Sequence, residues 1–97
     1  MLRIGHDDTN TSAVVLLLQG HILLEWADLL ERECEEPLRS GRRVVLDFTR
    51  VVFIGRTGFE TLKRLSRDGV EIVGCPPLLA DVLEHEGIAA SRRGGAP

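Results

Sequence analysis

Ninety-seven residues are enough for one small domain with its own core, but not for two. With 43% hydrophobic and 28% charged residues, the chain can bury enough apolar surface to exclude a disordered protein. The net charge of −3 gives no basis for nucleic-acid binding, and the longest apolar run, 13–18, is far shorter than the ~20 residues that cross a bilayer. Without a signal peptide, we expect a cytoplasmic protein with no direct membrane insertion, in which Cys34 and Cys75 are reduced thiols.

The first elements predict a β-hairpin. Residues 2–5 form a short strand, residues 6–10 are rich in turn formers, and the apolar run 13–18 forms a second strand. We expect this second strand to end at Gln19-Gly20.

An amphipathic helix is predicted over residues 23–39. Its apolar side chains share one stripe and its acidic side chains lie opposite. The stripe consists of Leu23, Trp26, Leu29, Leu30 and Cys34. Pro37 lacks a backbone N–H and disfavours the helical conformation of Glu36, so we expect an irregular last turn before Ser40-Gly41 ends the helix.

A buried strand follows. Residues 44–48 are nearly all apolar and begin with two β-branched valines, which is typical of a strand covered on both faces. Asp47 is predicted at its end, where its carboxylate either caps the turn over 48–50 or contributes to a site at the carboxyl edge of the sheet. A short extended passage over 51–54 comes next.

The chain then turns on Gly55 into a second helix. Phe59, Leu62 and Leu65 repeat at helical spacing. We expect Thr57 to be the N-cap of this helix and Glu60, three residues later, to complete a capping box. The pattern therefore predicts a hydroxyl at the positive end of a helix.

The rest of the chain predicts one more strand and one more helix. Gly69 suits the left-handed conformation that ends a helix, and a strand follows over 70–74. The prolines within 75–77 are typical of the start of a helix, and Gly87 suits the C′ position of a Schellman motif at its end. Residues 91–97 are predicted to be a disordered tail.

Residues 1–90 are thus expected to form a single α/β domain in the order strand-strand-helix-strand-helix-strand-helix. Parallel crossovers after the third strand predict a mixed β-sheet with helices packed against it.

The central stretch resembles the STAS domain, the family of anti-sigma factor antagonists and related domains of sulfate transporters. The resemblance is carried by a strand reading V-V-L-D, an apolar F-I pair and a turn that ends in Thr-Gly at a helix start. The family turn usually reads Asp-Ser-Ser-Gly. Here Thr57 matches the phosphoacceptor and Gly58 the glycine, while Gly55 replaces the acid and Arg56 the small hydroxyl residue, which makes this a degenerate phosphoacceptor turn. The resemblance covers residues 10–89. The family's further strand and terminal helix are expected either to be lacking here or to be replaced by a shortened variant, which would leave apolar surface favouring a homodimer.

The resemblance implies a bacterial, non-catalytic module that regulates transcription through protein–protein interaction. The unphosphorylated domain would bind an anti-sigma factor, a serine/threonine kinase of histidine-kinase-like fold, and so release a sigma factor. Phosphorylation of Thr57 would abolish this binding, because it adds about two negative charges to a packed interface. The partner-binding residues implied are Asp47, Gly55, Arg56, Thr57, Gly58, Glu60 and Lys63. The alternative is a STAS subunit of a phospholipid-transport ABC system, which clamps the transporter ATPase without being phosphorylated.

Charge is distributed unevenly along the chain. Residues 25–36 are mostly acidic and residues 39–67 mostly basic. This pattern indicates either two solvated faces of opposite sign or a basic rim around Thr57 that attracts an acidic partner.

Other chemistry has little support. His6, His21 and His85 have no metal-ligand spacing. The chain also lacks a phosphate-binding loop, a nucleophile elbow and a Cys-His-Asp arrangement. We therefore expect no enzyme activity, no metal and no cofactor.

Overall fold

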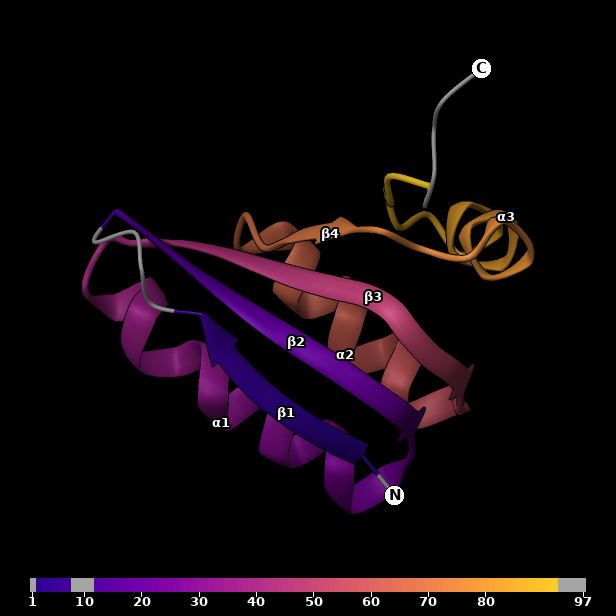
Figure 1. Ribbon diagram of the computed structural model, residues 1–97, viewed down its shortest axis with the longest axis horizontal. Helices are drawn as coiled ribbons and strands as arrows, with labels where there is room; N and C mark the ends of the chain where they lie inside the picture. Colours follow the sequence, from indigo (N-terminus) through magenta and orange to yellow (C-terminus); the bar gives the residue numbers. More distant parts are fainter. Residues whose placement is uncertain (1, 8–11, 93–97) are drawn as a thin grey trace.

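The computed structural model describes residues 2–7 and 12–92. Its elements are β1 (Leu2–Asp7), β2 (Ala13–Ile22), α1 (Leu24–Arg39), β3 (Arg43–Ile54), α2 (Arg56–Arg67), β4 (Glu71–Val73) and α3 (Pro77–His85) (Figure 1). The predicted α/β class and the order of the elements are confirmed.

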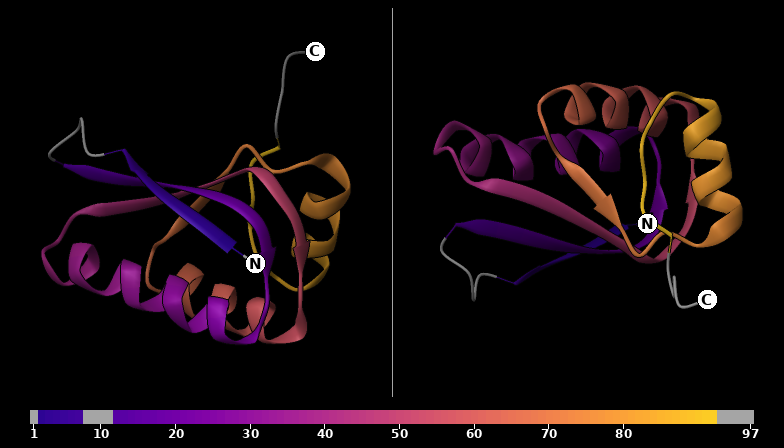
Figure 2. Two further views of the ribbon diagram at one scale, coloured as in Figure 1. Left: turned by 60° about the horizontal axis from the view of Figure 1, so that its bottom comes forward. Right: turned by 90° about the horizontal axis from the view of Figure 1, so that it is seen from above.

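The four strands form one mixed sheet in the order β1-β2-β3-β4. β1 pairs antiparallel with β2, as the predicted hairpin requires, and β2, β3 and β4 are mutually parallel. α1 and α2 lie side by side on one face of the sheet, and α3 lies beyond its end, near the carboxyl half of β3 (Figure 2). Within the described ranges, no helix covers the opposite face, which we call the open face.

The core lies between the sheet and the two helices that cover it. Leu16, Leu46 and Phe48 point inward from the central strands and are fully buried. Because alternate strand residues face opposite sides of the sheet, their neighbours lie on the open face. α1 contributes Ala27, Leu30 and Cys34 to the core, whereas Leu23 at its N-cap remains 38% exposed, unlike the rest of the predicted stripe.

β3 is a single strand of 12 residues, so the predictions that Asp47 ends a strand and that 51–54 forms a separate passage are wrong. The pairing of β2 with β3 shifts register between Leu17 and Gln19 and again between Gly20 and His21. Each shift leaves one additional residue on β3, which is a β-bulge. The prediction that β2 ends at Gln19-Gly20 is also wrong, since the strand continues to Ile22.

The glycine signals at the helix ends are confirmed. Gly69 and Gly87 have φ angles of 92° and 81°. At the end of α3, the N–H of Ile88 donates to the carbonyl of Leu83 and that of Gly87 to Glu84, both at 2.9 Å. These are the two hydrogen bonds of a Schellman motif.

Pro37 does not interrupt α1, which continues to Arg39. At the other end of the chain, Ser91 stays attached to β4, because its N–H donates to the carbonyl of Ile72 and its carbonyl accepts from Cys75, both at 2.9 Å. Residues 8–10 of the predicted turn and residues 93–97 of the predicted tail lie outside the described residues.

Both cysteines are free thiols inside the core, where each has 0% exposure. Burial, together with the charges of Glu33 and Glu31, raises the pKa of Cys34 to about 12. Burial raises the pKa of Cys75 to about 11, against the opposing charge of Arg92. A thiol reacts as its thiolate, so both are expected to be inert in the folded protein at neutral pH.

We predict that iodoacetamide will alkylate neither Cys34 nor Cys75 at pH 7.5 until the protein unfolds. The pKa values of both thiols in the folded protein exceed that of an unfolded thiol, about 8.5. The stability that the two neutral thiols contribute is therefore fully present below pH 8.5 and is lost as the pH rises towards 11–12. Mass spectrometry of alkylated protein, with and without urea, tests the first expectation, and urea unfolding from pH 7 to pH 11 tests the second. Rapid alkylation without urea would contradict the buried placement.

Candidate functional site

The start of α2 is the first part of the site. The helix begins at Arg56 with Gly55 as its N-cap, and no side chain caps it. The predictions that Thr57 is the N-cap and that Glu60 completes a capping box are therefore wrong. The reason is tertiary: the N–H of Gly55 donates to the carbonyl of Ile22 at 2.9 Å, which fixes Gly55 at the end of β2. The helix starts directly after this contact, and Thr57 becomes its second residue.

Gly58 allows this helix start to lie directly against the sheet. A Cβ atom placed on Gly58 would lie 2.8 Å from the carbonyl oxygen of Ile22 and 2.9 Å from Cγ2 of Ile54. Real Cβ atoms essentially never approach other atoms so closely. Gly58, which matches the glycine of the family turn, is therefore required for packing, and it sets the position of the neighbouring Thr57.

Thr57 is half-buried, and in the part of the chain that the structure describes its hydroxyl has no hydrogen-bond partner. The first N–H groups of a helix have no partner within the helix. At α2 these belong to Arg56, Thr57 and Gly58, and no side chain caps them. The exposed guanidinium of Arg56 adds a positive charge beside them. This environment favours negative charge at the Thr57 hydroxyl.

An exposed apolar rim adjoins the helix start, and sequence reasoning missed it. Leu23, Leu24 and Phe53 are 38%, 71% and 51% exposed. A Cβ atom on Gly55 would lie 2.9 Å from Leu23 Cδ2 and 3.9 Å from Phe53 Cε2, so both side chains flank the N-cap. We call Leu23, Leu24, Phe53, Arg56 and Thr57 the helix-start surface.

The exposure of Phe53 follows from the second β-bulge. His21 pairs with Phe53 while the preceding pair joins Gly20 to Val51, so Val52 and Phe53 both reach solvent. The apolar sequence of 51–54 does not indicate that Val52 and Phe53 are both exposed, because in a regular strand neighbouring side chains face opposite sides and one of these two would be buried.

Glu60 and Lys63 lie farther along α2. With Arg56, Phe59 and Glu86 they line a hollow of about 470 Å³. The Lys63 ammonium lies 3.3 Å from the Glu86 carboxylate, which links α2 to the end of α3. Arg56 has no ion pair among residues 2–7 and 12–92. The expected basic rim around Thr57 thus consists of Arg56 rather than of a row of unpaired cations.

Some of the other basic residues of the 39–67 segment pair with the acidic segment or with β4. The guanidinium of Arg64 contacts the Glu31 carboxylate at 3.1 Å and joins α2 to α1. Arg43 contacts Glu71 at 2.6 Å across β3 and β4. The uneven charge distribution in the sequence therefore serves in part to hold the elements together.

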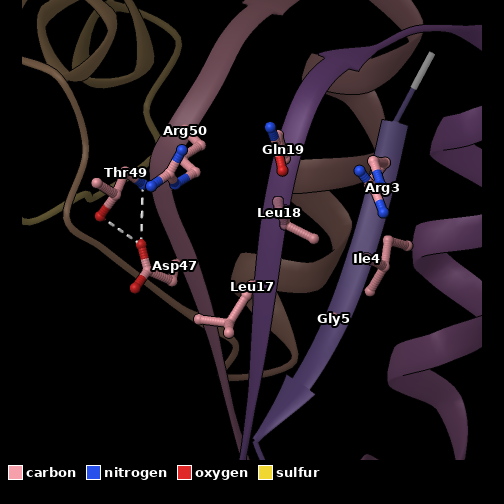
Figure 3. A pocket seen from close by; sticks show the side chains of 9 residues that line it. All are labelled: Arg3, Ile4, Gly5, Leu17, Leu18, Gln19, Asp47, Thr49 and Arg50. Atoms are coloured by element: carbon pink, nitrogen blue, oxygen red, sulfur yellow. Dashed lines mark hydrogen bonds between the residues drawn. The ribbon is translucent and has the colours of Figure 1, made fainter.

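Asp47 lies away from the other predicted site residues. It sits in the middle of β3, seven residues and therefore roughly 23 Å along the strand from its end at Ile54. Its carboxylate accepts hydrogen bonds from the N–H and hydroxyl of Thr49 at 2.8 and 2.6 Å (Figure 3). The capping role expected for Asp47 is confirmed, within the first β-bulge rather than in a turn. Its own hollow lies on the open face and contains none of the residues of α2.

Among the described residues, no group of three or more His, Cys, Asp or Glu is placed to hold a metal ion. None of the helices in that part of the chain combines the length and apolar character needed to cross a membrane.

The family model of the STAS domain matches residues 6–91. A comparison with curated proteins gave no match.

Solved structures show the same fold at low sequence identity. The unphosphorylated anti-sigma factor antagonist SpoIIAA is 11% identical, with a TM-score of 0.74 over 92% of this chain and 86% of that one. The phosphorylated form of the Bacillus cell fate determinant SpoIIAA is 13% identical, with a TM-score of 0.73 over 95% and 93% of the two chains. An anti-sigma factor antagonist from Mycobacterium paratuberculosis is 16% identical, with a TM-score of 0.73 over 95% and 86%.

Proposed function

Because the chain belongs to the STAS domain family, we propose that it is a non-catalytic regulatory module that binds an anti-sigma factor through the helix-start surface. The partner would be a serine/threonine kinase of histidine-kinase-like fold in the bacterial cytoplasm. The likeness to antagonists of anti-sigma factors supports this choice of partner at the level of the fold.

The observation that carries the proposal is the combination found at the start of α2. An exposed Phe53 and Leu24 offer apolar contact area, and beside the Thr57 hydroxyl Arg56 offers a charge that no other described residue pairs with. Aromatic residues and arginine are the types that dominate binding energy at protein interfaces. Arg56 favours an acidic group on the partner.

The start of α2 would stabilise a phosphate on Thr57, and that phosphate would repel an acidic group on the partner. The uncapped N–H groups of the first turn and the Arg56 guanidinium would stabilise its charge. An acidic partner group that pairs with Arg56 would be repelled by it. The phosphate would also repel Glu60, three residues along the same helix. The contacts of the phosphate with the first-turn N–H groups and with Arg56 must offset this repulsion. Thr57 phosphorylation would therefore release the partner without unfolding the domain.

We predict that Thr57→Asp lowers the affinity for the anti-sigma factor by about 100-fold or more, because it places like charges together in the interface. Thr57→Ala should retain the affinity. Because Thr57 is not the N-cap, Thr57→Ala should change the free energy of unfolding by less than about 0.5 kcal/mol, where loss of an N-cap costs about 1 kcal/mol. Calorimetric titration and urea unfolding measure the two quantities.

An acidic residue in the first turn of a helix is stabilising, so Thr57→Asp should fold at least as well as the unmodified chain. Loss of binding then reports on the interface alone. Equal affinity of the Asp and Ala variants would remove the phosphorylation switch from the proposal.

The partner itself is identified by affinity purification of the tagged chain from its own cells, followed by mass spectrometry. Recovery of an anti-sigma factor kinase is the expected result. Recovery of a transporter ATPase instead would favour a STAS subunit of a phospholipid-transport system and leave Thr57 without a switching role.

A further inference from the structure

A second hollow lies on the open face of the sheet, on the side opposite α1 and α2 (Figure 3). Its volume is about 500 Å³, within the range of sites for small molecules. The lining residues are Arg3, Ile4, Gly5, Leu17, Leu18, Gln19, Asp47, Thr49 and Arg50. The proposed binding of an anti-sigma factor uses none of these residues, and the hollow is separate from the helix-start surface.

The register of the strands arranges this hollow in two rows. Arg3 of β1, Gln19 of β2 and Arg50 of β3 are paired across the sheet, and Figure 3 shows Gln19 between the two arginines. Strands lie ~4.8 Å apart, so the Cα atoms of the arginines are about 10 Å apart and their long side chains can reach a common point above Gln19. Arg50 faces the hollow only because the first β-bulge shifts the register after Asp47.

The neighbouring row runs from Gly5 through Leu17 to Asp47, so its first two members are apolar and its third is a carboxylate. Gly5 pairs with Leu17, and Leu17 is 46% exposed on the open face. Since Gly5 has no side chain, the space above the sheet stays open at this position. A Cβ atom on Gly5 would lie 3.7 Å from Leu17 Cβ, an ordinary contact, so the glycine is not demanded by packing.

The charges of the lining residues decide which ligands the hollow can bind. Arg3 and Arg50 are both exposed, and neither has an ion pair within the described residues. The carboxylate of Asp47 is engaged by Thr49, whose N–H and hydroxyl both donate to it. The two arginines contribute +2 and Asp47 contributes −1, so the hollow keeps a net charge of +1. The guanidinium groups supply several N–H donors, and the Gln19 amide adds donors between them.

We propose that the hollow binds a small phosphate monoester. The phosphate lies over Gln19 between Arg3 and Arg50, and the organic group lies on Leu17 above Gly5. A phosphate monoester is close to a dianion at neutral pH, with a second pKa of about 6, and so matches two cations. Its oxygens accept the paired N–H groups of guanidinium, and an apolar organic group covers the exposed Leu17.

The test uses the full chain labelled with ¹⁵N and titrated with phenyl phosphate at pH 7.5. Saturable shifts are expected at the backbone amides of residues 3–5, 17–19 and 47–50. Arg3→Gln and Arg50→Gln should each weaken the affinity at least about tenfold, because each removes a charged hydrogen-bond donor. Gly5→Val, which places methyl groups in the hollow, should weaken binding of phenyl phosphate more than that of inorganic phosphate.

Arg67→Gln is the matched control, since it removes the same charge from the exposed end of α2, on the opposite side of the sheet. It should leave the affinity unchanged. An equal loss in this variant would overturn the proposal, as general electrostatic attraction would explain it. So would shifts confined to the amides of residues 56–58, which would place the anion at the start of α2.

Two further probes test the ligand class. Benzoate carries one negative charge and inorganic phosphate lacks an organic group, so both should bind more weakly than phenyl phosphate. If benzoate bound as tightly, the dianion would not be the recognised group. If inorganic phosphate bound as tightly, Leu17 and Gly5 would have no part in recognition. Either result would overturn the proposal as stated, and neither bears on anti-sigma factor binding.

Discussion

Replacing Phe48 with alanine is expected to lower the free energy of unfolding by about 3–5 kcal/mol. Phe48 is fully buried between the sheet and the helices, and it is the largest of the side chains with less than 2% exposure. Its removal takes away contacts on every side and leaves a cavity that the packed core cannot fill. Domains of this size have about 5–15 kcal/mol of stability in total, so the variant would be close to unfolding at 37 °C. Urea unfolding followed by circular dichroism measures the change.

Phe53→Ala is the matched control, because it makes the same substitution on the same strand. Phe53 is 51% exposed, and its ring lies 6.4 Å from that of His21 at the surface. The variant should lose about 1 kcal/mol or less, since surface substitutions seldom cost more. It should nevertheless weaken the proposed anti-sigma factor complex, because an exposed aromatic residue at the helix-start surface is a candidate for a binding hot spot. Similar stability losses in the two variants would contradict the bulged geometry of β3.

Replacing Gly58 with alanine is expected to lower the free energy of unfolding by about 1–3 kcal/mol. The alanine Cβ would meet the backbone oxygen of Ile22 at 2.8 Å, and a carbonyl in a paired strand cannot move away as a flexible side chain can. Alanine is the better helix former by up to about 1 kcal/mol, so propensity alone predicts the opposite sign. The direction of the change therefore separates the effect of packing from that of helix propensity.

The same substitution should reduce partner binding even where the protein remains folded. To relieve the contact with Ile22, the first turn of α2 must shift away from the sheet and take Thr57 and Arg56 with it. Gly5→Ala is the control, because its Cβ would make only an ordinary contact with Leu17 and its stability should stay the same or rise slightly. A Gly58→Ala variant as stable as Gly5→Ala would show that α2 does not lie against Ile22 as described.

Much of this fold was predictable from local patterns in the sequence. The apolar run 13–18 and the mostly apolar residues 44–48 identified the central strands, because a strand buried on a sheet needs such side chains whatever surrounds it. Gly69 and Gly87 identified two helix ends, because a positive φ is strongly unfavourable for most other residues. The resemblance carried by V-V-L-D and Thr57-Gly58 identified the family that residues 6–91 match.

The details of the site depended on contacts between distant segments. Thr57 has the sequence signature of an N-cap, but the hydrogen bond from Gly55 to Ile22 starts the helix at Arg56. The Thr57 hydroxyl is then left without a partner among residues 2–7 and 12–92. Two β-bulges, set by pairing with β2, turned Phe53 to the surface and brought Arg50 towards Arg3. They also left Asp47 in mid-strand, away from the start of α2.

Apolar residues that repeat with period 2 or 3.6 indicate whether a segment prefers to be a strand or a helix, and a glycine indicates a positive φ angle. The sequence by itself therefore determined the elements, their order and the family. The register between two strands is a property of the pair. It depends on side chains that are 30 residues apart in the chain, and a shift of one residue moves every following side chain to the other face. For that reason only the tertiary structure decided which of the predicted residues share a surface.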